Sequence, residues 1–481
     1  MNAFHVRSRM DVLCLCLAIT TSHAATCPPT EVADGNVGAI TSLHWVKRAS
    51  TFMDGPLRKA ALTMALNAID ASWPKASSLH TLPPLPATSD ILQRAERHNH
   101  AFNCIYRIDY KSDQNGFVAD HRNATHCTAF SSIARAMYLR VETFLRVLEF
   151  LVDSGKLMAA GFDQTTDFEF YIDVTDATPV DDKLFTALGR PLLSQSHSPV
   201  AGDRHTLPYP DHHQILGMAS VAGYSVPPEL EGDAVSLAEK YTGFNDASMR
   251  PWSDKKDAAV HRAQCVMTFG ATMDTSGRLR LLPVRGDVCQ HAQTMKSDDV
   301  DVGTATNEDT PSSLSGLCSP CSRREFVDWK KMASQWRYIV NTDGYGMSYD
   351  GSFWKLAANS TVFWVASGSI DARDVHTSKS TDARRNRALA SGPYWQTWYS
   401  ALLRPWCHYV PVKVDGVMQA LERCRRNERA CSQIADRASR AVRTIVTHDT
   451  MLQHLTATLV AVQGWQQATL CALRAQTLPK L

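Results

Sequence analysis

One stretch constrains the fold more than any other: "WRYIVNTDGYGMSYDGSFWKLAANSTVFWV", residues 336–365. Apolar β-branched and aromatic residues open and close it, which predicts two buried strands. A polar loop with glycines at 344, 346 and 351 lies between them and leads into a short helix. Strand, loop, helix and strand are the repeating unit of an α/β fold with a parallel sheet. The loop matches neither the GxGxxG dinucleotide motif nor the GxxxxGK[ST] phosphate loop.

The preceding half of the chain repeats this alternation. Residues 131–157 carry apolar side chains at helical spacing, and residues 167–179 form an alternating strand that runs into a turn. A helix that feeds a strand with polar residues at its carboxyl end is an α/β pattern, and ligands of such sheets bind beyond that end. We expect residues 190–230, which are rich in Pro, Gly and His, to be irregular.

Strand-like segments follow at 259–271 and 277–284, and helices at about 416–473. The polar stretch 295–322 reads as a surface loop. It contains Asp299-Val300-Asp301, the spacing of a metal-dependent sugar-nucleotide site, which we interpret as part of that solvated loop.

Length and charge limit the function classes. With 481 residues the chain has room for two domains of roughly 150–200 residues each. A net charge of +2 gives no general attraction to nucleic acid or to a membrane surface, so we expect neither as a partner. A charged substrate must therefore be bound by a few placed cations.

The N-terminus has the pattern of a cleaved secretory signal. Arg7 and Arg9 precede an apolar run at 12–19, and small residues follow before Ala25. That run is too short for a membrane anchor, so we expect no stable membrane span. The sequence predicts a protein of the endoplasmic reticulum or Golgi lumen, or a secreted one. Sequons at Asn123 and Asn359 agree with this route.

Cysteines support an oxidising compartment. Of the 13 cysteines, Cys14 and Cys16 lie in the predicted signal, so 13 − 2 = 11 remain, and most of them should pair. Cys104 and Cys127 bracket one loop and are a candidate pair. The Cys318-Ser-Pro-Cys321 motif could be a redox or zinc half-site, but no second ligand pair has matching spacing, and a structural disulfide role is favoured.

Four blocks, in order along the chain, resemble glycosyltransferase family 90. The family includes capsule-associated xylosyltransferases, protein O-glucosyltransferases of the Rumi type and lipopolysaccharide core glycosyltransferases. The blocks are "DFEFYIDVTDATP" (167–179), "PWSDKKDAAVHRA" (251–263), "RYIVNTDGYGMSYDGSFWKL" (337–356) and "LLRPWCHYVPVKVD" (402–415), with a weaker fifth at 430–442. Two departures stand out. The second block has His261-Arg262-Ala263 where much of the family has Phe-Arg-Gly, and Ser352 stands where many eukaryotic members have an arginine.

The resemblance implies an α/β fold of the GT-B type, two Rossmann-like domains that face each other across a cleft. The implied division is a signal peptide at 1–24, an extension and linker at 25–90, an acceptor-side domain at 91–205, a nucleotide-sugar domain at 206–415, and C-terminal helices at 416–481 that pack back. It further implies inverting transfer of xylose or glucose from a UDP-sugar to a hydroxyl of a glycan or secreted protein. No metal or other cofactor is required for such a transfer, because cationic side chains and helix N-termini can stabilise the leaving nucleotide.

The loop within 336–365 suits a diphosphate, since glycines let the backbone approach and a helix N-terminus directs N–H groups at an anion. The candidate donor-site residues are Lys255, Arg262, Asp343, Gly344, Ser348, Gly351, Ser352 and Lys355. A plain connection between two buried strands is the alternative reading of the loop. For Arg262 the alternative is a structural ion pair. His408 and Tyr409 could contact the donor, although a role in bracing the neighbouring strand is favoured.

Asp176, at the end of a strand and before a turn, is the candidate general base, and Asp173 is the second choice. A turn-forming aspartate is the structural alternative, and the family's aspartate usually lies one residue closer to the proline. Two other functions stay open: an inactive sugar- or nucleotide-binding homologue, and a disulfide-stapled secreted interaction protein.

Overall fold

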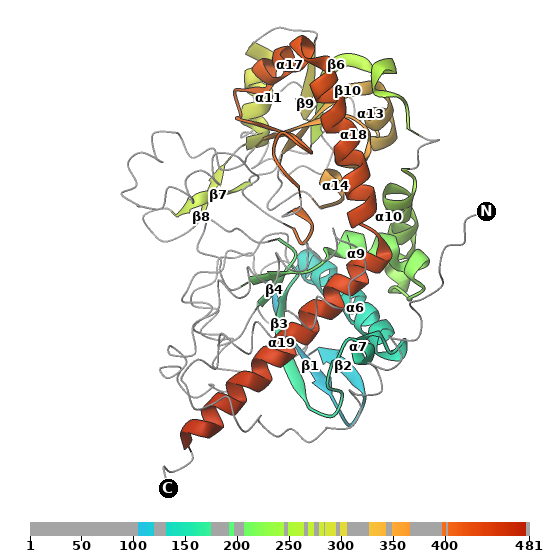
Figure 1. Cartoon of the computed structure of the whole chain (residues 1–481), viewed down its shortest axis with the longest axis vertical. Coiled ribbons are helices and arrows are strands. Elements are labelled where there is room, and N and C mark those ends of the chain that lie inside the picture. Colours follow the sequence, from blue (N-terminus) through green and yellow to red (C-terminus); the bar gives the residue numbers. More distant parts are fainter. Residues whose placement is uncertain are drawn as a thin grey trace, which may run out of the picture.

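The computed structural model describes residues 104–119, 131–174, 192–196, 206–244, 249–263, 268–273, 279–282, 284–294, 299–304, 327–342, 349–365, 397–400 and 403–477. In these residues the protein is mixed α/β, with two five-stranded sheets and a separate hairpin (Figure 1). The second sheet lies at the top of the view and the first sheet lies below it. The mixed α/β class expected from the sequence is confirmed.

The first sheet has the strand order β2-β1-β3-β4-β5. Its strands are β1 (Ile105–Lys111), β2 (Gly116–Ala119), β3 (Phe168–Asp173), β4 (Leu192–Ser194) and β5 (Thr206–Pro208). β1 is antiparallel to both β2 and β3, whereas β3, β4 and β5 are parallel. Because β5 belongs to this sheet, the sheet extends just beyond the domain boundary expected at residue 205.

Helix α6 (Ser131–Asp153) covers the first sheet with its apolar stripe. Val141, Phe144 and Leu148 recur at helical spacing and are buried, and the Phe144 ring lies edge-on to Phe170 of β3. The short helix α7 (Lys156–Ala159) follows, and then α9 (His212–Ala222) and α10 (Glu231–Thr242) after β5. The helix predicted at 131–157 and the strand predicted within 167–179 are therefore confirmed.

The second sheet is parallel throughout, with the order β12-β11-β10-β6-β9. Its strands are β6 (Lys256–Ala263), β9 (Val300–Thr304), β10 (Trp336–Thr342), β11 (Thr361–Val365) and β12 (Val410–Val412). Parallel sheets need cover on both faces. Accordingly Ile339 belongs to one apolar cluster, while its neighbours Tyr338 and Val340 belong to the other.

This strand order reverses direction between β6 and β10. β6 is first along the chain, β9 lies to one side of it, and β10, β11 and β12 follow on the other side. In a doubly wound sheet, ligands bind beyond the carboxyl ends of the strands at such a reversal. The topology therefore singles out the ends of β6 and β10 as the place for a ligand.

Helices complete this half of the molecule: α11 (Val284–Thr294), α13 (Trp329–Gln335), α14 (Tyr349–Ala357), α17 (Val417–Arg426) and α18 (Glu428–Ile445). The last helix, α19 (His448–Thr477), runs back along the first sheet (Figure 1). Its Gln463 both accepts from the backbone N–H of Asp163 and donates to the Asp163 carbonyl, each at 2.8 Å. The last helix thus packs back on the first half of the molecule. None of the described helices is long and apolar enough to cross a membrane.

Two sequence expectations were wrong. Residues 190–230 contain α9 and a 3-10 turn (Pro228–Leu230) instead of only irregular structure. The caps of α9 were readable: Asp211 accepts from the N–H groups of His213 and Gln214, and Gly223 ends the helix at φ 87°. The strand expected at 259–271 is also divided, since β6 ends at Ala263 and β7 (Thr268–Met273) pairs with β8 (Leu279–Leu282) as a separate hairpin.

Disulfide bonds occur in the described part of the chain. Cys424 and Cys431 join α17 to α18 with their Cα atoms 5.6 Å apart. Cys104 and Cys289 each take part in a disulfide bond as well. Cys407 has a free thiol. Cys127, the candidate partner of Cys104, and the Cys318–Cys321 motif lie outside the described residues, as does the predicted signal peptide.

A buried histidine makes the contact between α19 and the first sheet sensitive to pH. Nε2 of His454 lies 2.8 Å from the carbonyl oxygen of Pro208, and its ring packs on Trp398. Burial lowers the pKa of His454 to about 4 from the ordinary value of 6.5. The unfolded chain therefore takes up a proton at this residue between about pH 6.5 and pH 4 while the folded chain does not, so acidification favours unfolding.

We expect the free energy of unfolding to fall as the pH drops from about 6.5 to about 4, and His454→Gln to reduce that dependence. Glutamine can still donate to the carbonyl of Pro208 but does not titrate, and one buried histidine contributes up to about 1.4 kcal/mol per pH unit. Urea denaturation at several pH values measures the slope. Equal slopes for wild type and variant would show that His454 does not titrate on unfolding.

Candidate functional site

The carboxyl ends of β6 and β10 bring together residues from the second and third family-like blocks. Arg262 lies one residue before the end of β6, and Asn341 and Thr342 end β10. Gly351 lies in the first turn of α14, which follows β10. The predicted loop residues Asp343, Gly344 and Ser348 lie outside the described residues. The strand order predicts a ligand site at this edge of the sheet.

Lys355 is tied to the end of β10. Its Nζ donates to Oδ1 of Asn341 at 2.8 Å, and Nδ2 of Asn341 donates to Oγ of Ser352 at 3.3 Å. All three residues are buried. The side-chain amide of Asn341 thus joins two residues of α14, Lys355 and Ser352, to the end of β10. These contacts hold α14 in position against the sheet.

His261 contributes a hydrogen-bond acceptor at the same edge. Its Nδ1 lies 3.2 Å from the carbonyl oxygen of Val340. A carbonyl oxygen can only accept, so Nδ1 carries the proton and Nε2 is an acceptor. Nε2 is buried and has no hydrogen-bond partner. Burial, and then the charges of Lys355 and Arg285, lower the pKa of His261 to about 3, so the ring is neutral at physiological pH.

Thr342, the last residue of β10, has a buried Oγ1 that likewise makes no hydrogen bond. Buried polar atoms are nearly always satisfied in folded proteins, so two such atoms at one strand edge indicate a place for a ligand. Sequence reasoning missed His261, Asn341 and Thr342 as site residues. The available signal was that Asn341 and Thr342 are the polar end of a run of apolar strand residues.

Arg262 is engaged with the neighbouring strand. One terminal nitrogen donates to the carbonyl oxygen of Asp301 at 2.7 Å and the other to its Oδ1 at 2.6 Å. The structural ion pair that the sequence left open is therefore present. It holds the guanidinium at the carboxyl half of β6, with only 5% of the side chain exposed.

Lys255 lies at the opposite edge of the sheet, and here the structure corrects the prediction. It precedes β6, whose eight residues separate the two edges by roughly 23 Å. Its Nζ donates to the carbonyl oxygens of Ala333, Ala358 and Asn359 and to Oγ of Ser360, at 2.6–3.0 Å. Burial lowers the pKa of Lys255 to about 7, while four acceptor oxygens favour the ammonium form. Its position and contacts give it a structural role instead of a role in diphosphate binding.

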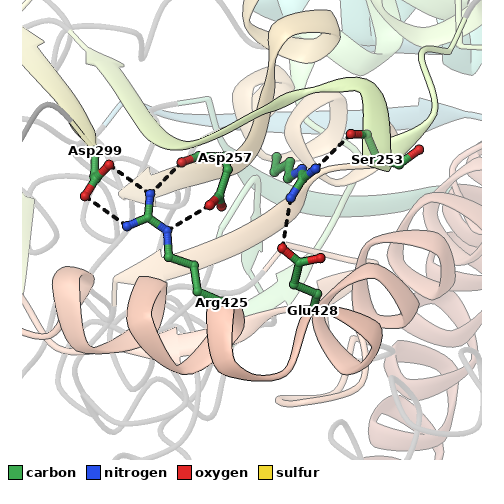
Figure 2. A network of polar contacts seen from close by, with 6 residues as sticks. Ser253, Asp257, Asp299, Arg425 and Glu428 are labelled. Atoms are coloured by element: carbon green, nitrogen blue, oxygen red, sulfur yellow. Dashed lines mark hydrogen bonds and ion pairs between the residues drawn. The ribbon is translucent and has the colours of Figure 1, made fainter.

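The same amino edge carries a second charged network (Figure 2). Arg425 of α17 donates to both carboxylate oxygens of Asp299 at 2.9 Å, and to the carboxylate and carbonyl of Asp257 at 3.0 and 2.7 Å. Beside it, Arg337 bridges Glu428 and the carbonyl of Ser253. This network joins α17 and α18 to the start of the sheet.

The Asp299-Val300-Asp301 motif is part of this framework. The sequence reading placed it in a solvated loop, whereas Asp299 precedes β9 and Asp301 lies within it. Each carboxylate pairs with an arginine from another element. Their partners account for both aspartates without a metal.

Of the two candidate bases, Asp176 lies outside the described residues. Asp173 is the last residue of β3 and is completely buried. Its Oδ1 accepts from the backbone N–H of Cys104 at 3.4 Å, and its carbonyl accepts from the Tyr209 hydroxyl at 3.1 Å. Burial and the nearby Asp173 charge raise the pKa of Tyr106 to about 12.

His408 and Tyr409 brace the chain before β12. Nδ1 of His408 accepts from the N–H of Arg404, and burial with Arg437 and Arg404 lowers the pKa of His408. The Tyr409 ring is buried against Trp364 of β11. These contacts match the favoured structural interpretation.

Of the two predicted glycosylation sequons, Asn359 lies in the turn before β11 with φ 51°, and Asn123 lies outside the described residues.

Comparison with known proteins adds two short similarities. No family model matches the chain. Uncharacterized protein 035R of Invertebrate iridescent virus 3 is 42% identical over 67 residues, which is 14% of this chain and 6% of the viral protein. Uncharacterized protein 179R of Invertebrate iridescent virus 6 is 33% identical over 63 residues, which is 13% and 5%. The matches cover about a twentieth of each relative, and neither name states an activity.

The Arg425 network should be measurable as a coupling energy. We expect a double-mutant cycle of Arg425→Gln with Asp299→Asn to give about 1 kcal/mol, because the contact is bidentate and part of a network. The exposed pair Arg146–Glu149 on α6 is the control and should give about 0.3 kcal/mol. Chemical denaturation of the four proteins in each cycle supplies both values. A coupling no larger than that of the control would mean that the network does not hold the sheet edge together.

Proposed function

We propose that the protein is an inverting glycosyltransferase that moves a sugar from a UDP-sugar to a hydroxyl of a glycan or secreted protein. The observation that carries the proposal is the polar cluster at the reversal of strand order in the second sheet. There β6 carries His261 and Arg262 near its carboxyl end, β10 ends in Asn341 and Thr342, and α14 is the next described element after β10. The resemblance of the same blocks to glycosyltransferase family 90 supports it.

The electrostatics of this edge suit an anion such as a diphosphate. Lys355, Arg285 and Arg262 all act on His261 as positive charges, so each lies within electrostatic reach of this ring. The N-terminal end of α14 adds a partial positive charge. Arg262 would be oriented by Asp301, and Lys355 by Asn341, so neither cation needs to be reorganised when a ligand arrives.

Two further groups suit the sugar part of a nucleotide. Nε2 of His261 can accept a hydrogen bond from a hydroxyl but cannot donate one to a phosphate. Oγ1 of Thr342 can do either. We assign these atoms to hydroxyls of the ribose or of the donor sugar, which leaves the phosphates to the cations and to the backbone of the glycine-bearing loop.

In the proposed reaction the acceptor hydroxyl attacks the anomeric carbon as the bond to the diphosphate breaks. A carboxylate at the carboxyl end of β3 accepts the hydroxyl proton, and the nucleotide diphosphate leaves with the cations of the second sheet as its counterions. Asp176 is the proposed base. Asp173 is the weaker candidate, because its carboxylate is buried and accepts a backbone N–H. The GT-B arrangement, with the two carboxyl edges facing each other, belongs to this proposal.

A panel of UDP- and GDP-sugars tests the donor site by thermal stability. We expect one UDP-sugar to stabilise the protein, by about 2.7 kcal/mol at a hundredfold excess over its dissociation constant. Lys355→Gln should abolish the effect, because the cation is lost, whereas the surface control Lys330→Gln should retain it. No stabilisation of well-folded wild type by any nucleotide would contradict the donor site and favour a secreted interaction protein.

The general base is tested by UDP release in the presence of the stabilising donor. We expect Asp176→Asn to lower the release rate at least about a hundredfold, within the usual range for general base catalysis, while donor stabilisation stays intact. Asp173→Asn is the matched comparison. A loss confined to Asp173→Asn would transfer the role to Asp173. Donor binding without release by wild type, across a range of acceptors, would identify the protein as a binding homologue.

A further inference from the structure

A second polar cluster lies at the start of α9, where β5 of the first sheet ends. It consists of Asp211, which caps the helix, and His212 and His213, the first two helical residues. One ligand atom from each residue lies within 4.8 Å of the others. Two imidazoles and one carboxylate are a common ligand set for Zn²⁺ and similar transition metals.

We propose that Asp211, His212 and His213 bind a transition metal ion of the Zn²⁺ class. The site lies at the carboxyl edge of the first sheet, the edge to which the proposed general base is assigned, but its metal binding does not rest on the transferase activity. Three protein ligands leave at least one coordination position for water or a ligand oxygen.

An unsatisfied ligand atom supports the proposal. Nδ1 of His212 is buried and has no hydrogen-bond partner. An imidazole nitrogen shielded from water in this way loses a hydrogen bond on folding, and a bound metal would replace it. The His212 and His213 ring centroids are only 3.7 Å apart, so the two rings are already gathered at one point.

Backbone hydrogen bonds hold the carboxylate of Asp211 beside the two imidazole rings. Oδ1 of Asp211 accepts from the N–H groups of His213 and Gln214 at 2.9 and 3.1 Å, and it lies 3.8 Å from Nδ1 of His213. Ligand atoms around a tetrahedral zinc ion are roughly 3.3 Å apart, as follows from its bond lengths. Binding therefore requires the ligand atoms, which lie within 4.8 Å of one another, to approach by up to about 1.5 Å, which side-chain rotations can supply.

One feature opposes a cation. Arg140 of α6 donates to the carbonyl of Val174 at 2.7 Å and is close enough to act electrostatically on His212. The carboxylate of Asp211 offsets this charge. An anion held by Arg140 and the histidines is the competing occupant, and the experiment separates the two.

The test is calorimetric titration of the full chain, freed of metal by a chelator, with Zn²⁺ and separately with inorganic phosphate. Co²⁺ substitution adds a spectroscopic readout, because its visible absorption reports coordination geometry. We expect one Zn²⁺ per chain to bind at this site. His212→Ala should weaken binding at least about tenfold, in line with the loss of a metal ligand.

Asp211→Asn is the sharper variant, because asparagine caps a helix as well as aspartate does but lacks the charge. It should keep the fold and weaken Zn²⁺ binding to a similar degree. His448→Ala is the matched control, since His448 also begins a helix and its Nε2 lies 3.2 Å from Oδ1 of the next residue, Asp449. The Zn²⁺ affinity of this variant should equal that of wild type. Three results would each overturn the proposal. The first is a Zn²⁺ affinity that stays unchanged in Asp211→Asn and His212→Ala, and the second is the absence of Zn²⁺ binding by wild type. The third is binding of phosphate but not Zn²⁺, with the phosphate binding lost in His212→Ala.

Discussion

The buried ammonium group of Lys255 organises the half of the molecule on which the proposed donor site depends. One of its four acceptors lies in α13, and the other three lie in the turn between α14 and β11. Ser360, one of them, also donates to the carbonyl of Trp336, where β10 begins. A single side chain thus satisfies carbonyl groups near the C-terminal ends of α13 and α14, and its removal would leave them without this donor.

The two edges of the second sheet consequently differ in character. At the amino edge, Lys255 and Arg425 are satisfied by acceptors from the protein itself, which joins the helices to the strands. At the carboxyl edge, Nε2 of His261 and Oγ1 of Thr342 have no partner. Rigidity at one edge and unsatisfied polar atoms at the other are what a preorganised binding site requires, because binding then costs little reorganisation.

Much of the fold could be read from local patterns, and the failures have physical causes. The helical spacing of Val141, Phe144 and Leu148 predicted α6, and the alternation after Asp167 predicted β3. The α9 helix was missed because surrounding Pro and Gly outweighed its two caps. Lys255 was misassigned because it is close to Arg262 in the sequence, which suggested that both bind one anion. Most of strand β6 lies between the two residues, so they stand at opposite edges of the sheet. Asp299 and Asp301 were read as solvated because their arginine partners are distant in the chain.

The sequence by itself determined the α/β class and the elements with strong periodicity, since each depends on residues that are close together in the chain. Only the tertiary structure decided the strand order 12-11-10-6-9 of the second sheet, and with it the reversal between β6 and β10. It also decided which charges are satisfied. Both depend on contacts between residues far apart in the chain, such as Arg262 with Asp301, 39 positions away, and Arg425 with Asp299, 126 positions away, which no local pattern records.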